Sequence, residues 1–194
     1  SINLLPQNVE TIIFGNYFAN TYTRFSKHER KAFTKHEEIT QFHKSIPKKL
    51  KTLYFGGDNL TDINKMLLTF DTIENIIIGP SFIQNIYILP NSIKYMNICS
   101  DEFYQEINKL PQSLERFYLD IPYFNKNIHI LPNSLKFLNI HSVDFDSNVD
   151  NLPKTLKSLT IISTPHIPSG SLASIPRVTI SLQVAPSWGK VITQ

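Results

Sequence analysis

The stretch "LPNSLKFLNI" at residues 131–140 decides the fold, because the chain spells it four times with few changes. It reads "LPNSIKYMNI" at 89–98, "LPQSLERFYL" at 110–119 and "LPKTLKSLTI" at 152–161, so successive copies start 21 residues apart. Self-similarity at a fixed period of this length is typical of a solenoid, in which each copy forms one coil.

Looser copies extend the repeat toward both ends. They read "LPQNVETIIFG" from Leu5, "IPKKLKTLYFG" from Ile46, "TFDTIENIIIG" from Thr69 and "IPRVTISLQV" from Ile175, the last with Pro176 in the proline position. We therefore expect a single solenoid over residues 1–194. Its repeats are expected at about 1–23, 46–68, 69–88, 89–109, 110–130, 131–151, 152–174 and 175–194.

Three positions of each copy are apolar: the third, sixth and eighth after the proline, as in Leu135, Leu138 and Ile140, except that Thr179 occupies the third position of the last copy. The last two are two residues apart, as on one face of a strand. Because no hairpin partner lies between copies, the strands must stack in parallel, about 4.8 Å apart. We expect an α/β repeat solenoid: a leucine-rich-repeat-like horseshoe with a parallel concave sheet of about eight short strands, and with loops and short helices on its convex side.

The segment "FNKNIHILP" at 124–132 carries a family resemblance. Its Phe124, Asn125, Ile128, Leu131 and Pro132 match the motif Phe-Asn, Ile and Leu-Pro, which is similar to the FNIP repeat, a leucine-rich-repeat variant of social amoebae and giant viruses. Such repeats often follow an F-box. The resemblance therefore implies the substrate-reading part of a ubiquitin-ligase adaptor and, for a viral protein, a location in the host cytoplasm or the virion.

Residues 24–45 interrupt the repeat. Capping-box patterns that begin at Ser26 and Thr34 predict short helices at about 27–33 and 35–43, and "DINKMLL" after Thr61 predicts a third. We expect these helices to lie on the convex side.

The tail at about 170–194 contains no Asn, Asp or Glu. We interpret it as a C-terminal cap over the last coil, because a solenoid needs its final apolar face covered. The alternative is a docking segment for a further domain or subunit.

Composition excludes several classes of protein. Cys99 is the only cysteine, so no disulfide framework or four-cysteine zinc site is expected. The net charge is +3 with scattered cations, and no apolar run reaches 18 residues, so we expect neither nucleic acid nor a membrane as partner. The start, "SINLLPQNVE", lacks the pattern of a signal peptide, so we expect an intracellular, cytoplasmic protein.

Two groups of residues contain side chains that could form a catalytic or a metal site. Cys99, Asp120 and His141 each fall nine residues after a proline on consecutive copies, but the carboxylate lies between thiol and imidazole, which is the wrong order for a nucleophile and its base. Three histidines at His28, His36 and His43 would be spaced by about 11 Å along a helix, too far for one metal ion. We expect no enzyme, no cofactor, no metal and no small-molecule substrate.

The fourth position after the proline alternates in charge from copy to copy. It is occupied by Glu10, Lys51, Glu74, Lys94, Glu115, Lys136 and Lys157. Sign alternates at each step as far as Lys136, so we expect opposite charges on neighbouring strands, which favours the correct register.

The fifth and seventh positions after the proline must point to the concave face. In the middle of that face they offer Tyr and Arg, the residue types that dominate interface hot spots. The predicted partner-binding residues are Tyr54, Tyr95, Asn97, Arg116, Tyr118, Phe137 and Asn139. The alternative is that another part of the same chain covers this face.

We therefore predict a non-enzymatic recognition module that binds a protein partner on its concave sheet. The alternative is a structural or assembly protein, such as a component of a virus particle, that contacts its neighbours through the convex helices and the C-terminal tail.

Overall fold

The computed structural model describes residues 7–14, 30–33, 46–56, 63–68, 70–80, 82–107, 109–163 and 179–184, and the statements below concern these residues. Residues 30–33, 65–66 and 179–184 are described by their backbone only.

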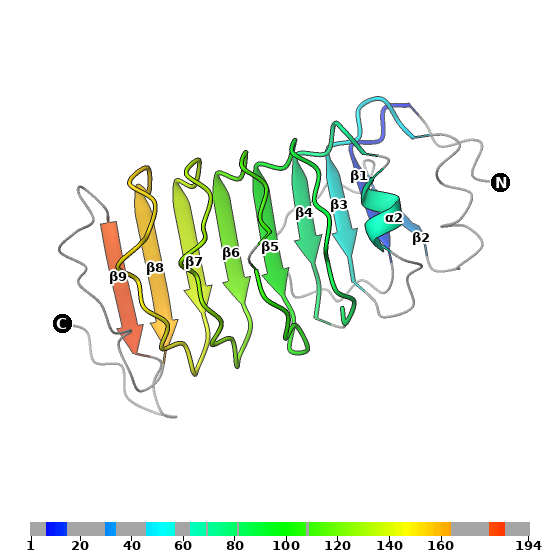
Figure 1. The fold of residues 1–194 in the computed structure, drawn as a ribbon. Coiled ribbons are helices and arrows are strands. Elements are labelled where there is room, and N and C mark those ends of the chain that lie inside the picture. Colours follow the sequence, from blue (N-terminus) through cyan, green and yellow to red (C-terminus); the bar gives the residue numbers. More distant parts are fainter. Residues whose placement is uncertain are drawn as a thin grey trace.

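The described residues form one parallel sheet of nine strands, in the order β2-β1-β3-β4-β5-β6-β7-β8-β9 (Figure 1). The elements are β1 Thr11–Phe14, β2 Arg30–Phe33, β3 Thr52–Phe55, α2 Ile63–Leu67, β4 Asn75–Ile78, β5 Tyr95–Cys99, β6 Arg116–Asp120, β7 Phe137–His141, β8 Ser158–Ser163 and β9 Thr179–Val184. The predicted parallel solenoid is confirmed, with one strand more than expected.

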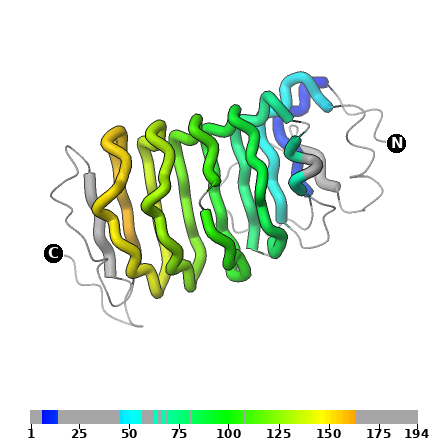
Figure 2. Tube along the Cα trace, in the orientation of Figure 1, coloured from blue at the N-terminus to red at the C-terminus, as the bar shows by residue number. Residues whose placement is uncertain are grey.

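Each coil consists of a strand and a return segment that crosses the same face of the sheet (Figure 2). The core lies between these two layers and contains every apolar residue expected at the third, sixth and eighth positions from β1 to β8. The return segments add Phe103, Phe124 and Phe145, which are at most 5% exposed. A coil alone cannot bury its apolar row, so each coil depends on its neighbours.

The repeated Leu-Pro motif forms a turn that ties one coil to the preceding one. In the copy at 131–140, Leu135 N–H donates to the Pro132 carbonyl at 3.0 Å, while Ser134 Oγ donates to the Leu114 carbonyl at 2.7 Å. Equivalent side-chain bonds come from Ser92, Ser113 and Thr155. The small hydroxyl residue of the motif thus satisfies a backbone acceptor of the neighbouring coil, which an alanine there would leave unpaired.

The insertion at 24–45 differs from the prediction. Residues 30–33 form β2, not the helix predicted over 27–33, and β2 pairs in parallel with the free edge of β1. Backbone hydrogen bonding along an open sheet edge favours a strand whatever the side-chain pattern. The helix predicted at 35–43 lies outside the described residues.

The third predicted helix is confirmed as α2, whose Ile63 and Leu67 belong to the core. The predicted placement of short helices on the convex side is not confirmed.

The last strand is displaced from its predicted register by two residues. Ile180 pairs with Leu159 and Leu182 with Ile161, whereas Pro176 in the proline position would have placed Leu182 opposite Leu159. The observed pairing keeps the step of 21 residues from Ser158 to Thr179. The remainder of the proposed C-terminal cap lies outside the described residues.

The face of the sheet opposite the core, here called the outer face, is the one predicted to be concave. Its first part is closed: Ile13, Tyr54 and Ile77 form a second apolar cluster and are at most 3% exposed. Gly79, at the end of β4, lies against this cluster. A Cβ at position 79 would lie 2.5 Å from Tyr54 Oη and 3.1 Å from the Gly56 Cα.

We predict that Gly79→Ala destabilises the protein by about 1–3 kcal/mol, the usual effect of overpacking a buried site. The fully buried Tyr54 ring cannot move aside freely. Urea denaturation followed by circular dichroism measures the free energy of unfolding.

The matched control is the same glycine change in a Tyr54→Phe background, where the closest atom is absent. There Gly79→Ala is expected to cost clearly less. Equal costs in both backgrounds would show that the phenol oxygen does not limit the space at position 79.

Candidate functional site

The exposed part of the outer face spans β5 to β8 and contains six of the seven predicted partner-binding residues. Tyr95, Arg116 and Phe137 lie side by side in register on β5, β6 and β7. Asn97, Tyr118 and Asn139 form the second row on the same strands. We call these six residues the aromatic patch.

Side-chain contacts within the patch link neighbouring strands. The Tyr95 and Tyr118 rings lie 5.5 Å apart with a tilt of 39°. The Arg116 guanidinium carbon lies 4.8 Å from the centre of the Phe137 ring, which is the geometry of a cation–π contact. These contacts order the side chains before any partner arrives, which lowers the conformational entropy lost on binding.

Tyr95 anchors the patch at its border. It is partly buried and packs against the closed cluster of Ile13, Tyr54 and Ile77. Burial raises the pKa of Tyr95, opposed by a hydrogen bond from Asn97. The phenol is therefore neutral at physiological pH and is held by a neighbour within the patch.

Tyr54, the seventh predicted residue, does not belong to the exposed surface. Its side chain is 0% exposed and belongs to the closed cluster with Ile13 and Ile77, which occupy the same position on β1 and β4. The strand alternation predicted its direction correctly, but not its burial.

The predicted charge ladder runs along the starts of the strands beside the patch. Lys94 Nζ lies 3.4 Å from Glu74 Oε1, and Lys136 Nζ lies 2.9 Å from Glu115 Oε1. The hydrogen bond from Lys136 is the main cause of a lowered pKa of Glu115. These exposed pairs act mainly on register, since each contributes little to stability.

Cys99, Asp120 and His141 lie on adjacent strands as predicted, with the carboxylate in the middle. His141 Nδ1 lies 2.9 Å from Asp120 Oδ1, while Cys99 Sγ lies 3.8 Å from Asp120 Oδ2. Burial and the Asp120 carboxylate raise the pKa of the Cys99 thiol to about 11. The thiol therefore stays protonated at neutral pH, the opposite of what a cysteine nucleophile needs.

Metal binding finds no support in the part of the chain that the structure describes, where no group of three or more His, Cys, Asp or Glu side chains is arranged to hold an ion. The predicted spacing of His28, His36 and His43 falls on residues outside that part.

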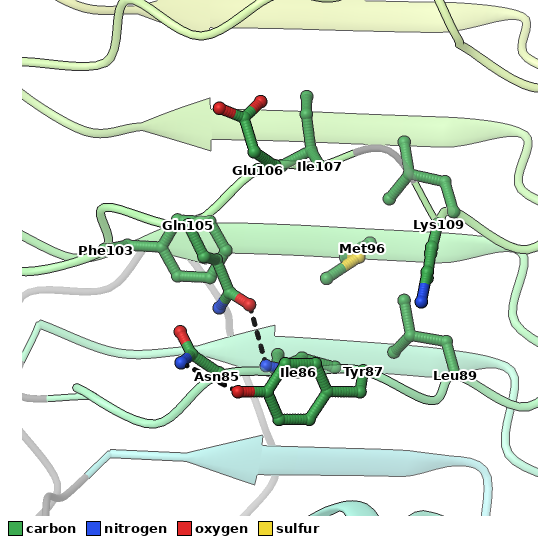
Figure 3. A pocket seen from close by; sticks show the side chains of 11 residues that line it. Asn85, Ile86, Tyr87, Leu89, Met96, Phe103, Gln105, Glu106, Ile107 and Lys109 are labelled. Atoms are coloured by element: carbon green, nitrogen blue, oxygen red, sulfur yellow. Dashed lines mark hydrogen bonds between the residues drawn. The ribbon is translucent and has the colours of Figure 1, made fainter.

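A cavity of about 350 Å³ opens on the return side, between the segments that follow β4 and β5 (Figure 3). Met96 and Ile107 are among its apolar lining residues. Some of its polar groups are engaged with one another: Ile86 N–H donates to Gln105 Oε1 at 2.7 Å, and Asn85 Nδ2 donates to the Tyr87 hydroxyl at 3.0 Å. Glu106 and Lys109 also line the cavity, and Glu106 Oε1 lies 3.7 Å from Lys126 Nζ.

A cluster of three lysines on the surface was not predicted from the sequence. Lys154 lies beside Lys136 and Lys157 in an open groove of about 490 Å³ at the starts of β7 and β8. The signal was present, because Lys157 repeats the sign of Lys136 where the ladder had alternated.

We predict that Cys99 reacts slowly with iodoacetamide. At pH 8 a thiol with a pKa of about 11 is ionised about a hundredfold less than one with the ordinary pKa of 9.0. The measurement is the alkylation rate against pH by mass spectrometry, and the same chain unfolded in urea supplies the reference rate.

Asp120→Asn is expected to raise the rate at pH 8, because it removes a carboxylate that disfavours the thiolate. Asp101→Asn is the matched control, since Asp101 contributes least to the shift. A folded wild type that reacts as fast as the unfolded chain would contradict the proposed environment of the thiol.

Comparison with known proteins supports the architecture. No protein-family model matches the chain, so the resemblance to the FNIP repeat stays a prediction. No curated protein matches it in sequence. Among solved structures, the chain is similar to CroV588, a circular leucine-rich-repeat protein of a giant virus, at 21% identity and a TM-score of 0.50 over 93% of this chain.

The chain spans 34% of the length of CroV588, and at this identity the likeness extends to the fold alone. Within the described residues, no helix has the length and apolar character that crossing a bilayer requires. The comparisons therefore support a leucine-rich-repeat-like parallel solenoid.

Proposed function

We propose that the protein is a non-enzymatic recognition module that binds a protein partner through the aromatic patch on β5 to β7. Leucine-rich-repeat-like solenoids generally serve as interaction scaffolds, because their stacked strands present a long continuous surface. The observation that carries the proposal is the accessible, preorganised set of Tyr95, Arg116, Tyr118 and Phe137 on adjacent strands.

The chemistry of the patch suits a protein surface. Tyr and Arg are enriched in hot spots, where large, rigid side chains become desolvated on binding. Asn97 and Asn139 lie on either side of Tyr118 in the sheet register, so amide donors and acceptors border the aromatic ring. A combination of Tyr with adaptable amides is also the composition of antibody paratopes.

The finer hypothesis is that the partner is the substrate of a ubiquitin ligase, for which this chain is the reading part of the adaptor. The resemblance of residues 124–132 to the FNIP repeat supports it.

A second candidate function is assembly, as in a building block of a virus particle or another multimeric structure. Exposed apolar side chains on the return segments favour it, since they lie away from the aromatic patch. Tyr104 and Tyr123 are both 66% exposed, and Tyr87 is 59% exposed. A partner seated there would contact the side opposite the patch.

We predict that Arg116→Ala/Tyr118→Ala loses a partner that the wild type captures from a lysate of amoebal cells, because the change removes two central hot-spot side chains. Mass spectrometry identifies the captured proteins, and a titration with the purified partner should then show affinity at least about tenfold lower, as expected for a loss above 1.4 kcal/mol.

Tyr104→Ala/Tyr123→Ala is the matched control, because it removes two equally exposed aromatic rings from the return side. Circular dichroism must first show that all variants fold. Loss of the partner, or of self-association measured by sedimentation, in this control but not in the patch variant would favour the assembly function.

A further inference from the structure

The charge ladder contains one departure from alternation, at Lys157. From Glu10 to Lys136 each charge faces its opposite on the next strand, and two of these pairs are in contact. Lys157 instead follows Lys136: the Lys157 N–H donates to the Lys136 carbonyl at 2.7 Å. Like charges on directly opposed residues destabilise a sheet. The fold itself therefore gains nothing from the second lysine.

The departure coincides with the groove at the starts of β7 and β8. Its lining residues are Glu115, Ser134, Lys136, Lys154, Thr155, Leu156 and Lys157. Among these described residues Glu115 is the only carboxylate, and it is already in contact with Lys136. Lys154 and Lys157 are exposed, and no carboxylate of the groove is left to balance them.

The hydroxyl groups of the groove already donate hydrogen bonds to backbone carbonyls. Ser134 Oγ donates to the Leu114 carbonyl, and Thr155 Oγ1 donates to the carbonyls of Asn133 and Leu135. The ammonium groups of Lys154 and Lys157 are thus the donors that the groove presents to a ligand, and they select for negative charge.

Carboxylates lie at the other ends of β5, β6 and β7, the strands that carry the patch. The described residues that follow β5, β6 and β7 include Asp101, Glu102 and Asp144, and Asp120 ends β6, whereas residues 99–102, 120–123 and 141–144 contain no Lys or Arg. The lysine groove at the starts of β7 and β8 and the carboxylates at the ends of β5, β6 and β7 therefore lie at opposite ends of the strands, although the net charge of the chain is only +3. Such an arrangement orients a partner as it approaches.

We propose that the partner presents an acidic peptide segment, whose carboxylates occupy the lysine groove while adjoining apolar side chains rest on the aromatic patch. The groove adjoins the strands beside the patch: Lys136 directly precedes Phe137, and Lys157 directly precedes Ser158, which pairs with Phe137. This inference rests on the proposed function of the patch and specifies the chemistry of its ligand.

The test uses three labelled probes in fluorescence-anisotropy titrations at low and moderate salt. The first is a short peptide in which a run of glutamates follows a pair of tyrosines. The second is its twin with glutamine in place of every glutamate, and the third is a single-stranded oligonucleotide of similar length. The wild type is expected to bind the acidic peptide at least about tenfold tighter than its twin, with a preference that weakens as salt rises.

Lys154→Gln/Lys157→Gln is expected to abolish most of this preference. Lys48→Gln/Lys49→Gln is the matched control, because it removes the same charge from exposed lysines before β3 and should leave the preference unchanged. Equal effects of the two pairs would reduce the result to net charge and overturn the inference. So would equal binding of the twin peptides, an absence of binding by either, or an oligonucleotide that binds with the same dependence on Lys154 and Lys157.

Tyr118→Ala separates this inference from the proposed function. If both hold, it weakens binding of both peptides while the preference for glutamate survives. If Tyr118→Ala has no effect but the lysine pair does, the groove binds acidic segments and the patch has been wrongly assigned. If Tyr118→Ala weakens binding and Lys154→Gln/Lys157→Gln does not, the patch binds the peptide but the groove does not select for an acidic ligand.

Discussion

The structure depends on one constraint: no coil can bury its own apolar side chains. Each coil must therefore pack against the next one in parallel register. Leu138 illustrates it, since it pairs between Phe117 and Leu159 and is 2% exposed. The N–H groups of Lys136 and Phe137 both donate to the Glu115 carbonyl, and the equivalent pair of bonds recurs at the start of each strand from β3 to β8. The same bonds that fix the register therefore close the core, which is why the step of 21 residues is so strictly kept from β5 to β9.

This constraint explains which parts of the fold were predictable. Apolar triplets identify a coil only where burial selects the residues, so β1 and β3 to β8 could be placed from the sequence. Strand β2 could not, because Lys31 pairs with Ile12 where the other coils carry an apolar residue. At the other end, Pro176 suggested a register that the sheet does not adopt. At both edges, backbone pairing with the neighbouring strand decided the outcome and the side-chain signal was weak or misleading.

The site was predictable to the extent that it follows from register. Alternation along a strand identified the outward residues, and the period placed Arg116 between Tyr95 and Phe137. Alternation cannot say whether an outward residue is covered, and Tyr54 and Tyr118 occupy the same position in their coils with opposite outcomes. Their neighbours in the sheet differ too: Tyr54 lies between two isoleucines on adjacent strands and Tyr118 between two asparagines. Three apolar residues in a row at an outward position were a readable sign of burial.

The solenoid separates the residues that make the fold from those free to vary. Core positions keep one chemical character in the coils of β1 and β3 to β8, whereas the fifth and seventh positions change from coil to coil without loss of the strand. The fourth position belongs to both groups, because its charges support the register while they face solvent. A departure from alternation at that position weakens the support that the ladder gives the stack, and the stack is nevertheless retained there. The sequence thus departs from the pattern that the fold prefers next to a patch of aromatic side chains that the fold does not require, and both features are explained by binding to a partner.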